Sequence, residues 1–242
     1  MKHIELLFDP KLADFFRIES RVLYPLVRKA SIKDIIESQG IPHTEVGEIL
    51  IKEIQANFEF IPAPGQQISV KSVQAPLDIS EPSLLRPRSF KDMRFVVDVN
   101  VGKLASFLRM MGYDTVFDHR LTDKDVALLA HSQQRVVLSR DRSLLKRGLI
   151  EYGRLVRSQE PEEQLKEIKA FFNLNCENMF SRCLRCNLVL KDVEKERIIH
   201  RLEPKTKKYF NRFSLCPGCD RIYWPGSHWE KMNQLVKIAG IC

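Results

Sequence analysis

Apolar and polar positions at the start of the chain predict a small α/β unit over residues 1–75. Short apolar runs in this stretch predict strands, at His3–Phe8, Val46–Ile51 and Ile68–Val73. Ile32, Ile35 and Ile36 lie on one face of a predicted helix, and Ser31 in front of them is a suitable N-cap. Residues 76–92 follow with several prolines and no sustained periodicity, which indicates a linker.

Over residues 93–173 strand-like and helix-like stretches alternate. The expected strands are Phe95–Val99, Asp114–Phe117, Arg135–Ser139 and Arg154–Arg157. The expected helices are Gly102–Met111, Val126–Ser132, Leu144–Leu149 and Pro161–Phe172. Strands that alternate with helices predict a parallel α/β sheet. Residues 174–242 form a further segment, with a basic insert and an aromatic tail.

Composition and charge indicate the cellular location of the protein and the kind of partner that it binds. The chain contains no run of 18 apolar residues, so we expect no membrane span, and the early acidic residues argue against a secretory signal. These features predict a cytoplasmic protein. Residues 1–85 hold 9 Lys/Arg against 12 Asp/Glu, whereas residues 86–242 hold 30 against 19. A basic excess confined to one part of the chain favours nucleic-acid binding there.

Acidic residues are expected near one edge of the predicted sheet. Asp98 ends the Phe95 strand, Asp141 follows the Arg135 strand, and Asp123 and Asp125 open the helix between them. Carboxylates that converge repel one another unless a cation lies between them, and Mg²⁺ or Mn²⁺ suits an oxygen-only site. The pattern therefore predicts a metal-dependent catalytic site. Each of these residues, taken singly, also fits a structural role such as a helix cap.

Basic residues near these acids fit a substrate that carries phosphate. Lys103 lies one turn after Asp98, at a helix N-terminus, which itself favours anions. Arg140 and Arg142 flank Asp141. Each of them, taken alone, is more often a solvated surface charge.

Two Cys-x-x-Cys motifs predict a structural zinc site. Cys183 and Cys186 form the first motif, and Cys216 and Cys219 form the second, separated from the first by 29 residues. Four thiolates in two tight turns complete a tetrahedral four-cysteine site for one Zn²⁺, which holds a fold and performs no chemistry. In a cytoplasmic chain we expect all six cysteines to be metal ligands or free thiols and not disulfides.

The aromatic segment after the second motif offers candidate substrate contacts. Trp224 lies in the run YWPGSHW and is suited to stack an unpaired RNA base, or else packs beneath the zinc loop. His228 is suited to contact phosphate or to transfer a proton, or else is simply packed or exposed.

Several blocks of sequence occur in an order typical of one family. They are FVVDVNVGKLASFLRMMGYDT, LTDKDVALLA, VVLSRD, EEQLKEI, CLRCN and CPGCDRIYWPGSHWEKM. Over residues 93–235 the chain resembles the Mut-seven C-terminal ribonuclease family, a branch of the PIN-like nucleases. The resemblance implies a PIN-like α/β core joined to a zinc ribbon and acting on RNA.

The resemblance also implies roles for particular residues. Asp98, Asp125 and Asp141 match the metal-binding acids, and Asp123 is a neighbouring candidate. Asn100, Lys103 and Arg109 match the block around the first carboxylate, Asn100 and Arg109 as substrate-binding residues. A further acid usual in PIN nucleases has no clear counterpart, Asp118 being the nearest, so the resemblance leaves open whether one or two catalytic ions bind.

The N-terminal stretch resembles a second known module. SIKDIIESQGIPHTEVGEIL is similar to the ubiquitin-like β-grasp module that precedes this nuclease in bacterial proteins. The resemblance implies that residues 1–75 bind a protein partner or RNA, or cover the site.

The sequence as a whole predicts a Mg²⁺- or Mn²⁺-dependent ribonuclease with a structural zinc ribbon that aids RNA binding. Its partner would be RNA, with tRNA and ribosome-associated RNA among the candidates, and no membrane. Alternatives are an RNA- or ribosome-binding protein that keeps the nuclease fold without catalysis, and a nuclease directed at DNA.

Overall fold

The computed structural model of the protein describes residues 2–238, with the backbone alone for residues 228, 231, 235, 237 and 238. Contacts divide the chain into two compact units. The first is made of residues up to Val101 together with Asp118–Arg157, and the second of Gly102–Phe117 and residues from Ser158 on. Within the described range, every helix is too short or too polar to cross a bilayer.

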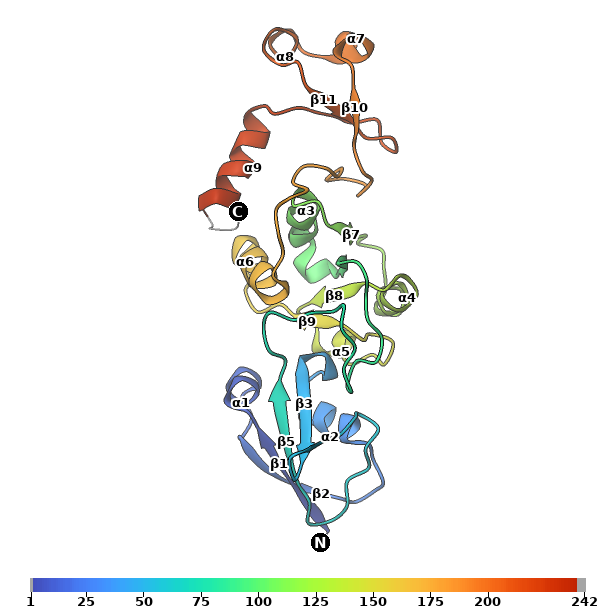
Figure 1. Cartoon of the computed structure of the whole chain (residues 1–242), viewed down its shortest axis with the longest axis vertical. Helices are drawn as coiled ribbons and strands as arrows, with labels where there is room; N and C mark the ends of the chain where they lie inside the picture. The colour runs from blue at the N-terminus through green and yellow to red at the C-terminus, as the bar shows by residue number, and fades with distance from the viewer. Residues whose placement is uncertain (1, 239–242) are drawn as a thin grey trace. The chain divides into compact units, whose positions relative to one another are not determined.

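A mixed sheet with two helices forms the N-terminal part of the first unit (Figure 1). Its elements are β1 (His3–Phe8), α1 (Pro10–Phe16), β2 (Arg21–Pro25), α2 (Ile32–Ser38), η1 (His43–Glu45), β3 (Val46–Ile51), β4 (Ile54–Gln55) and β5 (Gln67–Ser72). The strand order is β2-β1-β5-β3-β4, in which only β1 and β5 run parallel. The three strands expected from the sequence are present, whereas α1 and β2 were not expected.

Burial explains why this stretch folds as it does. Ile4, Leu6 and Phe8 point to the buried face of β1, with intervening residues more exposed, as a half-buried strand requires. Ile32, Ile35 and Ile36 of α2 are fully buried. The Ser31 hydroxyl accepts a hydrogen bond from the Asp34 amide at 3.1 Å, so the expected N-cap is present.

The rest of the first unit is a parallel α/β core. It consists of β6 (Arg94–Val97), η2 (Val99–Val101), α4 (Asp123–Gln133), β8 (Val136–Ser139), α5 (Arg142–Leu145) and β9 (Gly153–Leu155). Strand β8 pairs in parallel with β6 on one side and with β9 on the other. Phe95–Val97 and Val136–Leu138 are buried throughout, as expected for parallel strands covered on both faces. The predicted α/β fold with a parallel core is confirmed.

One strand ends earlier than the sequence pattern suggests. The apolar run predicts a strand over Phe95–Val99, but β6 ends at Val97. The Asp98 carboxylate accepts a hydrogen bond from the Val99 amide, and the chain turns there into the 3-10 helix η2. A side chain that competes for its neighbour's backbone amide interrupts a strand that apolar character alone would extend.

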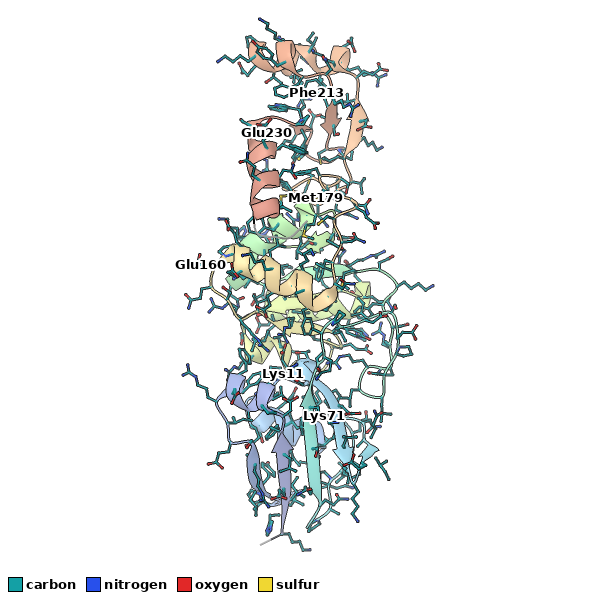
Figure 2. All side chains as sticks on the ribbon, turned by 60° about the vertical axis from the view of Figure 1, so that its left-hand side comes forward. Lys11, Lys71, Glu160, Met179, Phe213 and Glu230 are labelled. Atoms are coloured by element: carbon teal, nitrogen blue, oxygen red, sulfur yellow. The ribbon has the colours of Figure 1, made fainter. Side chains whose placement is uncertain are left out.

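The second unit contains the remaining helices and a finger. Its first elements are α3 (Gly102–Met110), β7 (Asp114–Val116) and α6 (Pro161–Phe172). The finger contains β10 (Lys191–Val193), α7 (Lys195–Ile198), η3 (Ile199–Arg201), α8 (Pro204–Tyr209), β11 (Phe213–Leu215) and β12 (Ile222–Tyr223), and α9 (Ser227–Ile238) follows. Phe213, labelled in Figure 2, packs with Ile198 and Leu202 in a small core of the finger.

Candidate functional site

The ends of two neighbouring strands bring Asp98 and Ser139 together. Strands β6 and β8 are parallel, so their carboxyl ends meet at one edge, and the Asp98 amide donates to the Leu138 carbonyl. The Ser139 hydroxyl donates to Asp98 Oδ2 at 2.6 Å, and the Asn100 side-chain amide donates to the same oxygen at 2.6 Å. Asp98 is buried, and these donors hold its carboxylate in one orientation.

Ser139 also links Asp98 to the second expected acid. The Asp141 amide donates to the Ser139 hydroxyl at 2.8 Å, and Asp141 Oδ1 accepts from the Ser143 amide at 2.7 Å as the N-cap of α5. Asn100 Oδ1 accepts from the Arg140 amide at 3.0 Å. Asp98, Asn100, Ser139 and Asp141 thus form one hydrogen-bonded group, which we name the carboxylate cluster. Ser139 was not among the residues expected from the sequence, although its place two residues before Asp141 was a usable signal.

Asp123 and Asp125 lie at the start of α4. Asp125 Oδ2 accepts from the Thr122 amide and hydroxyl, and the Thr122 hydroxyl accepts from the Asp125 amide, which makes a reciprocal capping box. These hydrogen bonds from Thr122 lower the pKa of the Asp125 carboxyl. Asp123 Oδ2 lies 3.6 Å from an Arg147 guanidinium nitrogen. Among the side chains that the structure describes, no three carboxylates or histidines converge closely enough to hold one ion.

The donor chemistry of the carboxylate cluster still fits a hard cation. Its side chains offer carboxylate and hydroxyl oxygens, together with the Asn100 amide that orients the Asp98 carboxylate. Oxygen is the ligand atom that Mg²⁺ and Mn²⁺ prefer. Asp141 uses Oδ1 for its cap, and Asp125 uses Oδ2, so the second oxygen of each carboxylate is not engaged in those caps. Ser139 contacts the Asp98 carboxylate and the backbone amide of Asp141, so the cluster offers two acids for one ion and not three.

The expected phosphate-contacting residues have different environments. Arg140 is exposed beside the carboxylate cluster. The Arg142 guanidinium lies over the Phe16 ring of α1, 4.8 Å from its centroid, a cation–π contact within the first unit. Lys103 is exposed on α3, in the second unit.

Arg109 is buried and has backbone partners. Its Nε donates to the Thr115 carbonyl, and its Nη1 donates to the carbonyls of Leu184 and Arg185, each at 2.9 Å. Burial lowers the pKa of this guanidinium, while the nearby thiols of Cys183 and Cys186 oppose that shift. The placement favours a structural role, because the guanidinium joins α3 and β7 to the first cysteine motif.

The four expected cysteine ligands form one cluster. The Sγ atoms of Cys183, Cys186, Cys216 and Cys219 all lie within 4.8 Å of one another, and the cluster is compatible with a zinc ribbon. Cys186 Sγ lies 3.3 Å from Cys183 Sγ and 3.2 Å from Cys216 Sγ. Four sulfurs around one Zn²⁺ at about 2.3 Å would be roughly 3.8 Å apart, so a small expansion accommodates the ion.

The environment of Cys183 favours a thiolate. Burial opposes ionisation, but hydrogen bonds from the Tyr223 hydroxyl, at 3.1 Å, and from Cys186 outweigh it and lower the pKa of Cys183 to about 6. Because zinc binds thiolates, this environment suits a metal ligand. Cys176, by contrast, is disulfide-bonded, so the expectation of a metal ligand or free thiol is wrong for this residue.

The first cysteine motif is anchored by residues that sequence reasoning missed. Asn187 Oδ1 accepts from the Thr115 amide at 3.0 Å, and its amide nitrogen donates to Asp114. Arg182 Nε donates to the Gly112 carbonyl at 2.8 Å. In a sequence these side chains look like ordinary surface residues, since nothing local shows that Asn187 reaches β7 and that Arg182 reaches the turn before it.

Trp224 is partly exposed, with 37% of its surface accessible, and its ring lies 6.5 Å from that of Phe213. His228 lies in α9, and its side chain falls outside the described part of the structure.

The N-terminal sheet and the parallel core are joined by buried polar contacts inside the first unit. Glu45 Oε1 accepts from the Leu155 amide of β9 at 2.8 Å, and Oε2 pairs with the Arg154 guanidinium at 2.5 Å. The ring of His43 lies 2.7 Å from the Ile150 carbonyl and 2.7 Å from the Glu37 carboxylate. Glu45 is 2% exposed, so the N-terminal sheet and the parallel core meet in a buried interface and are not connected by the chain alone.

Comparison with known proteins agrees with this geometry. Residues 93–236 match the family described as the Mut7-C RNAse domain, and residues 1–78 match the family described as Mut7-C ubiquitin. No curated protein and no solved structure matches the chain significantly. The first match spans more than half of the chain and includes the carboxylate cluster and all four clustered cysteines. The chain therefore belongs to the Mut7-C ribonuclease-domain family and carries the ubiquitin-like module of that family in front of it.

Proposed function

We propose that this protein is a metal-dependent ribonuclease that hydrolyses RNA phosphodiester bonds. The observation that carries the proposal is the carboxylate cluster, in which Ser139 joins Asp98 and Asp141 at the carboxyl ends of two parallel strands. Open α/β sheets bind their ligands at this edge. The match of residues 93–236 to a ribonuclease family supports RNA as the substrate class.

Within this proposal Asp98 and Asp141 hold one Mg²⁺ or Mn²⁺, with Asp125 and then Asp123 as further acids from α4. When bound, such a cation neutralises phosphate charge and provides a nucleophile for hydrolysis near neutral pH. Asn100 and Ser139 fix the orientation of the Asp98 carboxylate by donating to Oδ2. Arg140 and Lys103 are exposed positive charges that attract the RNA backbone.

The finger supplies binding and not chemistry in this proposal. One Zn²⁺ held by the four clustered cysteines stabilises it, and the insert that contains Lys205, Lys207, Lys208 and Arg212 adds positive charge. We divide the chain into the ubiquitin-like module (1–75), a linker (76–92), the nuclease core (93–173) and the zinc ribbon with its tail (174–242). The module is a candidate surface for a protein partner, and we propose a cytoplasmic location.

Cleavage of RNA by purified protein tests the proposal. We expect zinc-loaded protein to degrade RNA when Mg²⁺ or Mn²⁺ is added, and Asp98→Asn to lower the rate by at least about 100-fold, because the cation loses its central carboxylate. Asp92→Asn is the matched control, since Asp92 is exposed and pairs only locally with Arg94. Thermal denaturation of both variants checks that they are folded.

The same experiment separates the alternatives. Equal degradation by the wild type and by Asp98→Asn would refute the nuclease assignment. The absence of three converging acids within residues 2–238 is the observation that favours a protein which binds RNA without cleaving it. Binding of RNA without cleavage by either variant would establish that second function, and cleavage of single-stranded DNA but not RNA would establish a DNA nuclease.

A further inference from the structure

Trp224 separates neighbouring hollows on the surface of the finger. One hollow, of about 370 Å³, is lined by Arg185, Arg201, Arg221, Thr206 and the acid Glu203, and we name it the arginine hollow. A second, of about 260 Å³, is lined by Phe180, Tyr223, Trp229 and Met232, and we name it the aromatic hollow. Trp224 lines both, as do its near neighbours Arg221 and Ile222. All of these residues belong to the second compact unit.

The arginine hollow is suited to an anion. Arg201 is partly neutralised, since it lies 3.0 Å from the Asp220 carboxylate. Within the described residues, Arg185 and Arg221 form no ion pair with a carboxylate. Three guanidinium groups therefore outnumber the two acids beside them, Asp220 and Glu203, and they match the planar, multi-donor recognition of phosphate.

The cysteine cluster fixes the backbone that carries two of these arginines, Arg185 and Arg221. Arg185 lies between the two cysteines of the first motif, and Arg221 follows the second motif by two residues. The Arg185 carbonyl accepts from the buried Arg109, and Cys219 itself lines the arginine hollow. Backbone fixed in this way lets the side chains bind with less loss of conformational entropy than on a free loop.

The aromatic hollow is suited to the face of a nucleobase. The rings of Phe180 and Trp229 lie 4.9 Å apart, and Trp224 exposes 37% of its surface beside them. Aromatic faces stack any base, provided that the base is unpaired.

Gly226 keeps the indole of Trp224 where it lies. A Cβ at this position would come within 2.6 Å of Trp224 Nε1 and 3.0 Å of Cδ1, so any larger residue would displace the ring. The Gly226 amide also donates to the Trp224 carbonyl at 2.8 Å. The absence of a side chain at Gly226 therefore leaves the space in which the Trp224 indole lies.

We propose that the finger binds one unpaired nucleotide of a single-stranded RNA, with its phosphate in the arginine hollow and its base stacked on Trp224 in the aromatic hollow. The shared wall formed by Arg221, Ile222 and Trp224 places the two subsites next to each other, as phosphate and base are in one nucleotide. The site rests on the proposed function for its choice of RNA, but it involves none of the residues of the carboxylate cluster.

The test measures binding of a fluorescent single-stranded oligonucleotide of mixed sequence. It uses the full zinc-loaded chain as Asp98→Asn, without Mg²⁺ or Mn²⁺, so that cleavage cannot interfere. Both tryptophans of the chain lie in this region, so quenching of their fluorescence reports base stacking. We expect the single strand to bind and quench, and a fully paired duplex of the same length to quench far less.

Variants distinguish the proposed site from general charge attraction. We expect Trp224→Ala to weaken binding roughly 5- to 150-fold, the effect of removing one stacked base, and Trp224→Phe to weaken it less. Arg221→Ala should weaken binding more than Arg197→Ala, which removes the same charge from exposed α7 outside both hollows. Zinc content and thermal denaturation show whether each variant keeps the finger.

Two results would overturn the proposal. One is equal loss of affinity in Arg221→Ala and Arg197→Ala with none in Trp224→Ala, which would indicate diffuse electrostatic binding only. The other is equal quenching by duplex and single strand. Because no cleavage is measured, either result leaves the nuclease proposal standing, and failure of cleavage by the wild-type protein leaves this site standing.

Discussion

At the scale of single residues, the carboxylate cluster depends on a serine. Ser139 is fully buried, donates to Asp98 Oδ2 and accepts from the Asp141 amide, so one hydroxyl orients the Asp98 carboxylate and holds the backbone of Asp141, whose own carboxylate accepts from the Ser143 amide. Buried polar groups satisfied in this way have few alternative arrangements. The orientation of the acids is therefore set before any substrate or ion binds.

Asp125 is the residue whose role is most open to experiment. We expect Asp125→Asn to keep stability within about 0.5 kcal/mol, because the amide oxygen still accepts from Thr122, and to lose most RNA cleavage because the charge is gone. We expect Asp125→Ala to lose cleavage and about 1 kcal/mol of stability as well. Urea denaturation and a cleavage assay measure both quantities. Wild-type cleavage by Asp125→Asn would show that Asp125 only caps α4.

At the scale of elements, the short helix η1 protects the edge of the parallel sheet. Glu45, the last residue of η1, accepts from the amide of Leu155 in β9 and pairs with Arg154. Arg86 donates to the Thr44 and Val46 carbonyls on either side of it. An unpaired edge strand tends to pair with other chains, so a buried acceptor at β9 both stabilises and protects this edge.

Removal of the Glu45 carboxylate should destabilise the folded protein. We expect Glu45→Ala to lower the free energy of unfolding by about 3 kcal/mol or more, because it breaks a buried ion pair. The control is Glu48→Ala, which breaks a more exposed pair with Lys71, labelled on β5 in Figure 2, and should cost less than about 1 kcal/mol. Chemical denaturation measures both values. Similar small losses in the two variants would show that the joint contributes little.

At the scale of the whole molecule, the cysteine cluster and the carboxylate cluster belong to different compact units. The four cysteines lie in the second unit, whereas Asp98, Ser139 and Asp141 lie in the first. Through Arg109 and Asn187 the first cysteine motif is also joined to β7 of its own unit. The effect of losing the metal should therefore extend beyond the finger within the second unit.

Zinc chelation followed by hydrogen exchange tests this separation. Structural zinc contributes about 10 kcal/mol or more in isolated fingers, so we expect the amides of β11 and β12 to lose protection, together with the Thr115 amide that donates to Asn187. The amides of Val137 and Leu138 should stay protected, and adding Zn²⁺ back should restore protection at the other amides. Loss of protection at Val137 would contradict the independence of the two units.

The sequence by itself determined those features that depend on local chemistry. The buried apolar runs of β6 and β8, the Ser31 cap and the two cysteine motifs follow from residue spacing, because strand, cap and knuckle geometry are each set within a few residues. The ordered blocks also identified the family. Asp98 and Asp141 could be expected at one edge, since parallel strands end on the same side.

Only the tertiary structure decided which of the candidate side chains meet. Register brings Ser139 to Asp98, packing buries Arg109 beneath the first cysteine motif, and folding of the finger gathers Arg185, Arg201 and Arg221 around Trp224. The periodicity of the sequence does not predict these contacts, because the residues that form them are far apart in the chain. Asp125 combines both cases. Its cap with Thr122 is local and follows from the sequence, whereas its distance from the other acids depends on how α4 packs.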